Sequence, residues 1–219
     1  MKKAFLFFIS CFFFISASAQ VALKTEGQDP AYVETIKGRA QKIVDALGIS
    51  DDLRAENVRN IIANRYFLLN DIHTEYDKTV KFAKDSLQGK ERDKVRQEAA
   101  NRRDAELYKH HFELQTALST YLNEEQIEAV KDGMTYGRVQ RDYKAQCEMI
   151  PSLTPGERAQ VLLWLKEARE FAMDAGDSKQ KHAWFDKYRG RTNNWLSARG
   201  YDLKKEREEW QKRTEKAKK

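Results

Sequence analysis

Apolar residues spaced three and four positions apart constrain this chain most, because that spacing builds one face of an α-helix and does not suit a strand. The longest such run extends from about Asp51 to Leu87, just before the turn residues Gln88-Gly89-Lys90. No stretch alternates Val, Ile or Thr with polar residues, and no Asn-Gly or Asp-Gly pair joins two apolar runs. The sequence therefore predicts an all-α protein, a helical bundle with a long N-terminal helical hairpin.

Capping and turn residues divide the chain into segments. Asp29-Pro30 opens the first helix and Gly48 ends it. Asn123 to Gln126 and Thr154 to Glu157 have the capping-box pattern, in which the cap and the third residue bond each other's backbone. We expect six or seven helices, at about residues 29–48, 51–87, 91–121, 123–150, 154–176, 178–200 and 202–216.

These helices are expected to form one domain, residues 29–219, with two lobes. Residues 29–121 contain the long antiparallel hairpin with a solvated tip, and residues 122–219 form a bundle. The helix that follows Thr154 has the most strongly apolar face, so we expect it at the centre of the second lobe. Gly133 and Gly137, four positions apart, indicate either a close helix contact or a local break.

The first 19 residues have the pattern of a secretory signal peptide, with Lys2 and Lys3, an apolar run and then Ala17-Ser18-Ala19. The apolar run is too short to span a bilayer. We therefore expect export to the periplasm or the cell exterior and a flexible leader over residues 20–28. Removing the segment takes two lysines from the 40 Lys and Arg, against 34 Asp and Glu, so the formal charge falls from +6 to +4.

Several kinds of protein are excluded or disfavoured. Cys147 is the only cysteine expected after signal removal, so a disulfide-stapled scaffold is excluded. The sequence has no second long apolar stretch, so no transmembrane segment is predicted after signal removal. Acidic residues are interleaved with the basic ones, and this pattern, together with export, argues against a nucleic-acid partner. The four histidines lack the spacing of metal ligands, so neither a metal site nor a cofactor is predicted; they are His73, His110, His111 and His182.

Catalysis is the less favoured interpretation but stays open. Nothing local marks Cys147 or His182 as activated, and a lone cysteine beside Met149 and Ile150 is typical of a small buried hydrophobe. Paired carboxylates for sugar hydrolysis are usually presented on Gly- and aromatic-rich loops, which this sequence lacks. No catalytic residue is assigned.

The stretch from Lys181 to Asp202 combines large rings with forked donors and amides. At about 100° per residue, Trp184, Tyr188, Thr192 and Trp195 share one face, a spacing that predicts core. A polar edge lies beside it, where a saccharide or a partner loop could bind, because sugar hydroxyls pair with Arg, Asn and Asp. The candidate ligand-binding residues are His182, Trp184, Asp186, Tyr188, Arg189, Arg191, Asn193, Asn194, Trp195, Tyr136 and Arg141. Gly190 would let a ligand or another backbone approach closely.

Tyr188-Arg189-Gly190-Arg191, with Asn193-Asn194 and Gly200-Tyr201-Asp202, resembles a family of secreted, uncharacterised helical proteins from polysaccharide-degrading bacteria. That family is labelled sugar-binding, so the resemblance implies an oligosaccharide or polysaccharide partner. Leu122-Asn-Glu-Glu-Gln126 and Leu153-Thr-Pro-Gly-Glu157 are similar to the Leu-Thr-x-x-Gln motif of small periplasmic stress chaperones. Each copy departs from the motif at one position, and capped helix starts also explain both.

Two functions therefore stay open, with an enzyme as a third. A non-enzymatic carbohydrate-binding protein should have a compact pocket with exposed Trp or Tyr faces beside the donors at 189–194. A periplasmic chaperone or adaptor that binds protein partners should instead have a broad apolar groove and bury the rings of Trp184 and Trp195. An enzyme should show two carboxylates facing each other across a cleft.

Overall fold

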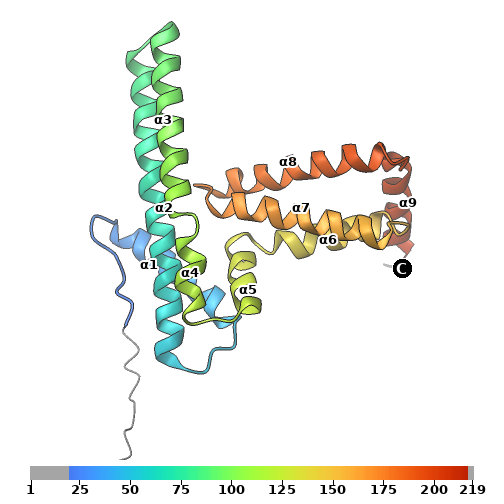
Figure 1. Cartoon of the computed structure of the whole chain (residues 1–219), viewed down its shortest axis with the longest axis horizontal. Helices are drawn as coiled ribbons and strands as arrows, with labels where there is room; N and C mark the ends of the chain where they lie inside the picture. Colours follow the sequence, from blue (N-terminus) through green and yellow to red (C-terminus); the bar gives the residue numbers. More distant parts are fainter. Residues whose placement is uncertain (1–19, 217–219) are drawn as a thin grey trace, which may run out of the picture.

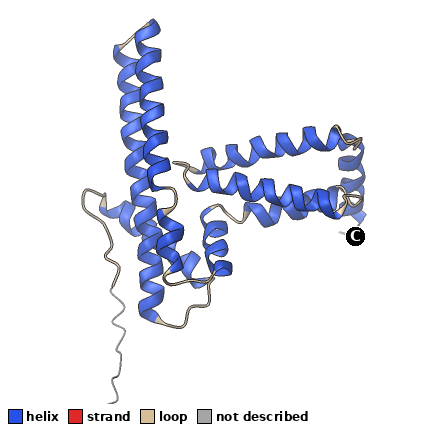
Figure 2. Ribbon diagram, in the orientation of Figure 1, coloured by secondary structure: helices blue, strands red, loops and turns tan. Residues whose placement is uncertain are grey.

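In the computed structural model, residues 20–216 are described, and the expected signal peptide lies outside the described residues. Within this range the chain forms nine helices and no strand (Figure 2), which confirms the all-α prediction. Nine replace the expected six or seven because two expected helices are interrupted, at 111–112 and at 135–137. None of the nine is both long enough and apolar enough to cross a membrane.

The first five helices form the first lobe (Figure 1). A long antiparallel hairpin joins α2 (Asp52–Ser86) to α3 (Gly89–His110), as the sequence predicts. Packed on the base of α2 are α1 (Pro30–Asp45) and α4 (Glu113–Ser119), and α5 (Glu124–Met134) packs on these two helices.

The core of the first lobe lies at the base of the hairpin, where Ile36, Ile62 and Leu118 are almost completely buried. Farther out, beyond His73, the hairpin buries only the small side chains Ala83 and Ala99. The outer half of the hairpin is therefore a close-packed pair of helices with very little apolar core.

Four helices form the second lobe, which projects sideways from the hairpin (Figure 1). The antiparallel pair α7 (Pro155–Met173) and α8 (Ser178–Ser197) is joined by α6 (Arg138–Met149), which packs on α7. At the far end, α9 (Leu203–Lys216) crosses α6 and α8. Because α7 contacts both α6 and α8, it lies at the centre of this lobe.

Both predicted capping boxes are present. Asn123 accepts a hydrogen bond from the backbone N–H of Gln126 at 2.8 Å, and the Gln126 side chain returns the contact. Thr154 and Glu157 make the same reciprocal pair at the start of α7. These local bonds satisfy N–H groups that the first helical turn leaves without partners.

The helix expected over residues 91–121 is interrupted after His110. The interruption turns the chain so that Leu114 and Leu118 enter the first core. It also leaves the carbonyl oxygen of His110 free of the helix, and that oxygen accepts a hydrogen bond from Arg65 Nη1 at 2.9 Å. A buried guanidinium from another helix therefore takes over a backbone acceptor at the break.

The two glycines have different roles at the second interruption, at residues 135–137. Gly137 and the preceding Tyr136 both have a φ of 62°, a left-handed conformation that ends α5. A Cβ added to Gly133 would lie 2.9 Å from Cγ1 of Ile43, so α1 and α5 approach closely there. A break and a close contact both occur, and α5 packs with the first lobe although residues 122–219 were expected in the second.

The leader, expected to be flexible, is hydrogen-bonded along α2. The backbone N–H of Val21 donates to Asn57 at 2.7 Å, and Asn60 donates to the Val21 carbonyl at 2.8 Å. One turn further on, Asn64 bonds the backbone of Ala22 and Lys24. Because these asparagines recur on one face of α2, they hold residues 21–24 of the leader against the helix.

Candidate functional site

Most of the candidate stretch, residues 181–197, lies in α8, and its buried stripe is slightly rotated from the one expected. Phe185, Tyr188 and Thr192 are buried, and Trp184 and Trp195 lie half-buried at its edges. Trp184 stacks on Phe171 with ring centroids 4.6 Å apart. The two tryptophans are therefore neither free platforms nor fully enclosed core.

The arginines of this stretch lie on the outer surface of the second lobe. The Arg191 guanidinium lies 4.7 Å from the centroid of the Trp164 ring and 3.4 Å from a carboxylate oxygen of Glu167. Arg189 approaches Asp186 at 3.3 Å. A Cβ added to Gly190 would have no atom within 4 Å. No other part of the described chain therefore packs closely against the backbone at this glycine.

Two predicted residues, Tyr136 from the turn between α5 and α6 and His182 from α8, meet at the start of α8. The rings of Tyr136 and His182 lie 5.6 Å apart, and His182 Nδ1 is 2.8 Å from Nη1 of Arg138. Arg138 also pairs with Asp142 at 2.7 Å, and Arg141 approaches the same carboxylate at 3.3 Å. The candidate residues thus divide between this cluster and the opposite end of α8.

Near that opposite end is a pocket of about 240 Å³, which we call the α9 pocket. It contains two of the predicted residues, Arg189 and Asn193, but not Asn194 or Trp195. Its lining combines two guanidinium groups, a carboxylate and two amides with a tryptophan ring. The lining residues are Asp142, Ala145, Gln146, Met149, Val161, Leu165, Arg189, Thr192, Asn193, Arg207 and Trp210.

One polar atom of the α9 pocket lacks a partner. The side-chain amide nitrogen of Gln146 is buried and has no hydrogen-bond acceptor among the described residues. Leaving such a donor unsatisfied costs about 1–3 kcal/mol. A ligand hydroxyl at this place would remove that cost.

A larger cavity, about 430 Å³, lies where the two lobes meet, and we call it the inter-lobe cavity. α1, α2 and α5 form one side, and the turn between α7 and α8 forms the other. Its lining includes tyrosine rings and basic groups beside aliphatic side chains. The tyrosines and charged residues of the lining are Tyr32, Arg39, Lys42, Tyr66, Tyr136, Asp177 and Lys181.

Lys181 is a buried cation of this cavity, with only 5% of its surface exposed. Its ammonium donates to the Met134 carbonyl at 3.0 Å and lies 5.3 Å from the centroid of the Tyr66 ring. Burial, and then the charge of Arg39, lower the pKa of Lys181 to about 8, while Asp174 acts in the opposite direction. The fold thus holds this ammonium in a place that disfavours its charge.

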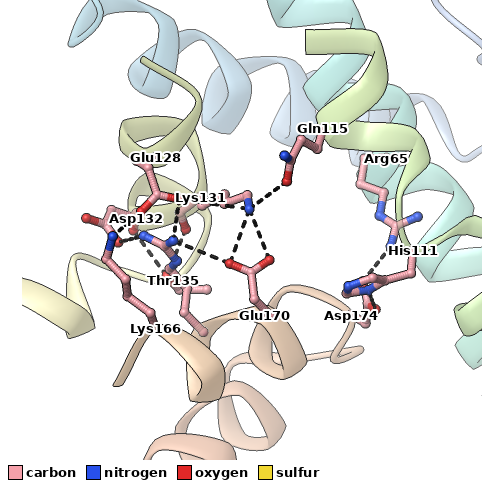
Figure 3. Close-up of polar contacts among 11 residues, drawn as sticks. Arg65, His111, Gln115, Glu128, Lys131, Asp132, Thr135, Lys166, Glu170 and Asp174 are labelled. Carbon is pink, nitrogen blue, oxygen red and sulfur yellow. Dashed lines mark hydrogen bonds and ion pairs between the residues drawn. The ribbon is translucent and has the colours of Figure 1, made fainter. Parts of the chain in front are cut away.

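Buried ion pairs connect the lobes beside the cavity (Figure 3). Arg169 of α7, only 2% exposed, pairs with Glu128 and with Asp132 of α5, each at 2.7 Å. Lys131 reaches from α5 to Glu170 of α7 at 3.1 Å. These contacts fix α7 to α5 and so fix the second lobe to the first.

A second bridge lies a short distance away (Figure 3). Asp174, at the end of α7, accepts from Arg65 of α2 and lies 2.6 Å from Nδ1 of His111. Its backbone carbonyl is 2.8 Å from Nε2 of His73. Two side chains of α2 and one from the turn after α3 therefore hold the turn that leads into α8.

The electrostatics of the first bridge favour its charged form. Burial alone would raise the pKa of Glu128, but hydrogen bonds from Arg169 and Lys166 outweigh it and lower the pKa to about 2.

Residues 20–216 bring together no group of three His, Cys, Asp or Glu side chains that could hold a metal ion.

Sequence reasoning did not assign Lys181 to a site, although one signal was available. Lys181, Phe185, Tyr188, Thr192 and Leu196 recur at helical spacing, so a lysine lies on a stripe that is otherwise mostly apolar. Arg39 and Tyr66 gave no comparable signal, because their roles depend on how distant helices pack.

The chain belongs to the DUF3826 family, described as proteins of unknown function, whose pattern matches residues 33–217. The match includes every helix except the first three residues of α1. A comparison with curated proteins finds no match.

Proposed function

We propose that this chain is an exported, non-enzymatic carbohydrate-binding protein and that a saccharide binds in the α9 pocket. The observation that carries the proposal is the lining of this pocket: Asp142, Gln146, Arg189, Asn193 and Arg207 around Trp210. Carboxylate, amide and guanidinium groups supply both the acceptors and the donors that sugar hydroxyls need.

The size and the unsatisfied amide of the pocket support the same proposal. Its volume of about 240 Å³ is below the range of roughly 300–1,000 Å³ that is usual for drug-sized ligands. We therefore expect a single sugar unit or the end of a chain. The buried Gln146 amide nitrogen would gain an acceptor from a hydroxyl of that sugar.

A chaperone or adaptor function has less support. The large apolar side chains that are exposed among the described residues lie on several helices and at both ends of α2. They are Leu53, Phe82, Tyr108, Phe112, Tyr136, Leu163 and Phe171. A surface that captures unfolded polypeptide would need a contiguous apolar patch.

The experiment compares two neighbouring asparagines in the chain that begins at Gln20. Asn193 lines the pocket and Asn194 does not, so Asn193→Ala and Asn194→Ala make the same chemical change at different places. We expect a saccharide from a panel of neutral and acidic sugars to raise the unfolding temperature of the wild type. Asn193→Ala should lose about tenfold in affinity, the effect of about 1.4 kcal/mol, and Asn194→Ala should bind unchanged.

Two results would contradict the proposal. One is a wild type that no saccharide in the panel stabilises. The other is an equal loss of affinity in both asparagine variants, which would place the sugar outside the α9 pocket. Trp210→Ala adds a second position, since loss of the ring should weaken binding while α9 still packs through Leu203.

A further inference from the structure

The inter-lobe cavity is separate from the proposed sugar site and differs from it in charge. Three cations line it, Lys181 at depth and Arg39 and Lys42 on exposed parts of α1, and Asp177 is the single carboxylate in the lining. The Asp177 carboxylate accepts a hydrogen bond from the backbone of Gln180 at 2.7 Å as the N-cap of α8. The basic charge of the cavity is therefore largely uncompensated.

None of the three cations has an ion-pair partner within the part of the chain that the structure describes. For Lys181 this is unusual, because a buried ammonium is normally paired with a carboxylate. Lys131 provides the comparison: it is also buried and in the same junction, and it bonds Glu170 and Gln115. Lys181 has a carbonyl and two tyrosine rings instead.

The tyrosines give the cavity flat walls. Tyr32, Tyr66 and Tyr136 come from α1, α2 and the turn before α6, and the Lys181 ammonium lies 5.3 Å from the centroid of the Tyr66 ring and 6.0 Å from that of Tyr136. Burial raises the pKa of Tyr66 to about 12, so its hydroxyl keeps its proton and adds no negative charge. Such walls suit the flat face of an aromatic or sugar ring.

We propose that the inter-lobe cavity binds a small organic acid whose oxyanion lies beside Lys181 and whose ring lies against the tyrosine walls. The oxyanion would neutralise the buried ammonium and lessen its repulsion from Arg39, adding to the opposing charge of Asp174. Sugar acids and aromatic acids share this chemistry, and probes of each kind distinguish them.

Binding there would also connect the lobes. The ligand would contact α1 and α2 of the first lobe and the beginning of α8 in the second. Because it would bind the folded junction and not the unfolded chain, it should raise the unfolding temperature, and the rise should grow with the logarithm of ligand concentration above the dissociation constant.

The test uses matched pairs of probes that differ in charge and little in shape. Glucuronate is compared with glucose, 4-hydroxybenzoate with 4-hydroxybenzyl alcohol, and sodium sulfate is the probe without a ring. We expect at least one organic acid to bind about tenfold more tightly than its neutral counterpart. The acid that binds identifies the ring type, and sulfate alone should bind weakly because it cannot use the walls.

Three variants test the position of the charge. Lys181→Met should abolish the preference for the acid, and Lys181→Arg should keep part of it. Lys187→Met removes one exposed lysine from the same helix, outside the cavity, and should bind as the wild type does. Without ligand, Lys181→Met should unfold at the same temperature as the wild type or higher, because an unpaired buried charge has been removed.

Several outcomes would overturn the inference. They are equal binding of every acid and its neutral counterpart, retained acid preference in Lys181→Met, or a marked loss of stability in that variant with no acid bound by the wild type. Asn193→Ala separates this inference from the proposed sugar site: acid binding that disappears in Asn193→Ala and persists in Lys181→Met would place the acid in the α9 pocket.

Discussion

Two buried cations at the junction of the lobes, Arg169 on α7 and Lys181 on α8, differ in whether carboxylates surround them. Arg169 contacts three carboxylates, from Glu128, Asp132 and Glu170. Lys181 contacts none within the described residues and is held by the Met134 carbonyl and two rings. Both are almost completely covered by protein, so the difference between them is pairing and not depth.

The contrast distinguishes a buried charge that is paired within the fold from a buried charge that is left without a carboxylate partner. Arg169 fixes α7 to α5, and its partners compensate for the loss of water around the guanidinium. Lys181 forms no comparable connection, and its burial lowers its pKa to about 8. A folded chain that keeps such a charge unpaired beside a cavity has a residue prepared for a partner from outside.

The largest expected effect tests the paired side. Arg169→Met should lower the free energy of unfolding by about 3–5 kcal/mol, because it leaves buried carboxylates without their partner. Urea denaturation measures this change. Lys166→Met is the matched control, since Lys166 pairs with the same Glu128 at 2.9 Å but is 44% exposed, and it should cost less than about 1 kcal/mol. Similar losses of unfolding free energy in both variants would show that the burial of the cation does not determine how much its ion pairs stabilise the fold.

The next effect tests the unpaired side through pH. The pKa of Lys181 is about 8 in the folded protein and 10.5 as the reference value, so the unfolded chain binds more protons between these values. Stability should therefore rise with pH in this window, by on the order of 3 kcal/mol at most. Arg39, Asp174, Asp177, Tyr66 and Tyr136 surround the group.

Lys181→Met isolates this contribution. Urea denaturation of the wild type and the variant at pH 7, 8, 9 and 10 should show a difference that favours the variant near pH 7 and shrinks as pH rises. A difference that stays constant over this range would mean that the Lys181 ammonium is as well accommodated in the fold as in water.

A smaller effect comes from glycines inside and outside the junction. A Cβ at Gly176 would lie 2.7 Å from the His73 ring, so Gly176→Ala should destabilise by about 1–3 kcal/mol through overpacking. Gly190→Ala makes the same change at an open position of α8 and should stabilise by about 0.5–1 kcal/mol. Thermal unfolding of the two variants checks both signs, and destabilisation by Gly190→Ala would point to a contact at that face of α8.

The smallest effect concerns acid. The pKa of Glu128 is lowered to about 2 from 4.5, so its contribution to stability is present above pH 4.5 and is lost as pH falls toward 2. Because the side chain is 37% exposed, Glu128→Gln should cost less than about 1 kcal/mol at pH 7. The difference in unfolding free energy between Glu128→Gln and the wild type should be smaller at pH 3 than at pH 7. A larger difference at pH 3 would contradict the ion pair assigned to Glu128.

The fold was largely predictable because its signals are local. The Asn123 and Thr154 caps depend on residues within one turn, and the sequence contains them both. The interruption after His110 was not predictable, because it depends on Arg65 from another helix taking the freed carbonyl. The left-handed Tyr136 was equally hidden, since a bulky residue seldom adopts positive φ.

The sites were less accessible than the fold. Spacing identified an apolar stripe in α8, but which of its neighbours line a pocket depends on α9 and on the lobe junction. Asn193 and Asn194 are adjacent in the sequence, and only Asn193 lines the α9 pocket. Lys181 was visible as a charge at an apolar position, yet its tyrosine walls come from residues up to 149 positions away.

The thin packing of the outer hairpin has a practical consequence. Beyond His73 it buries only Ala83 and Ala99, and the segment from 80 to 98 lines neither the α9 pocket nor the inter-lobe cavity. Deleting equal lengths from both helices and rejoining them through the Gln88-Gly89 turn should give a shorter protein with both cavities intact. Backbone amides near the tip should exchange their hydrogens with solvent long before those at the base.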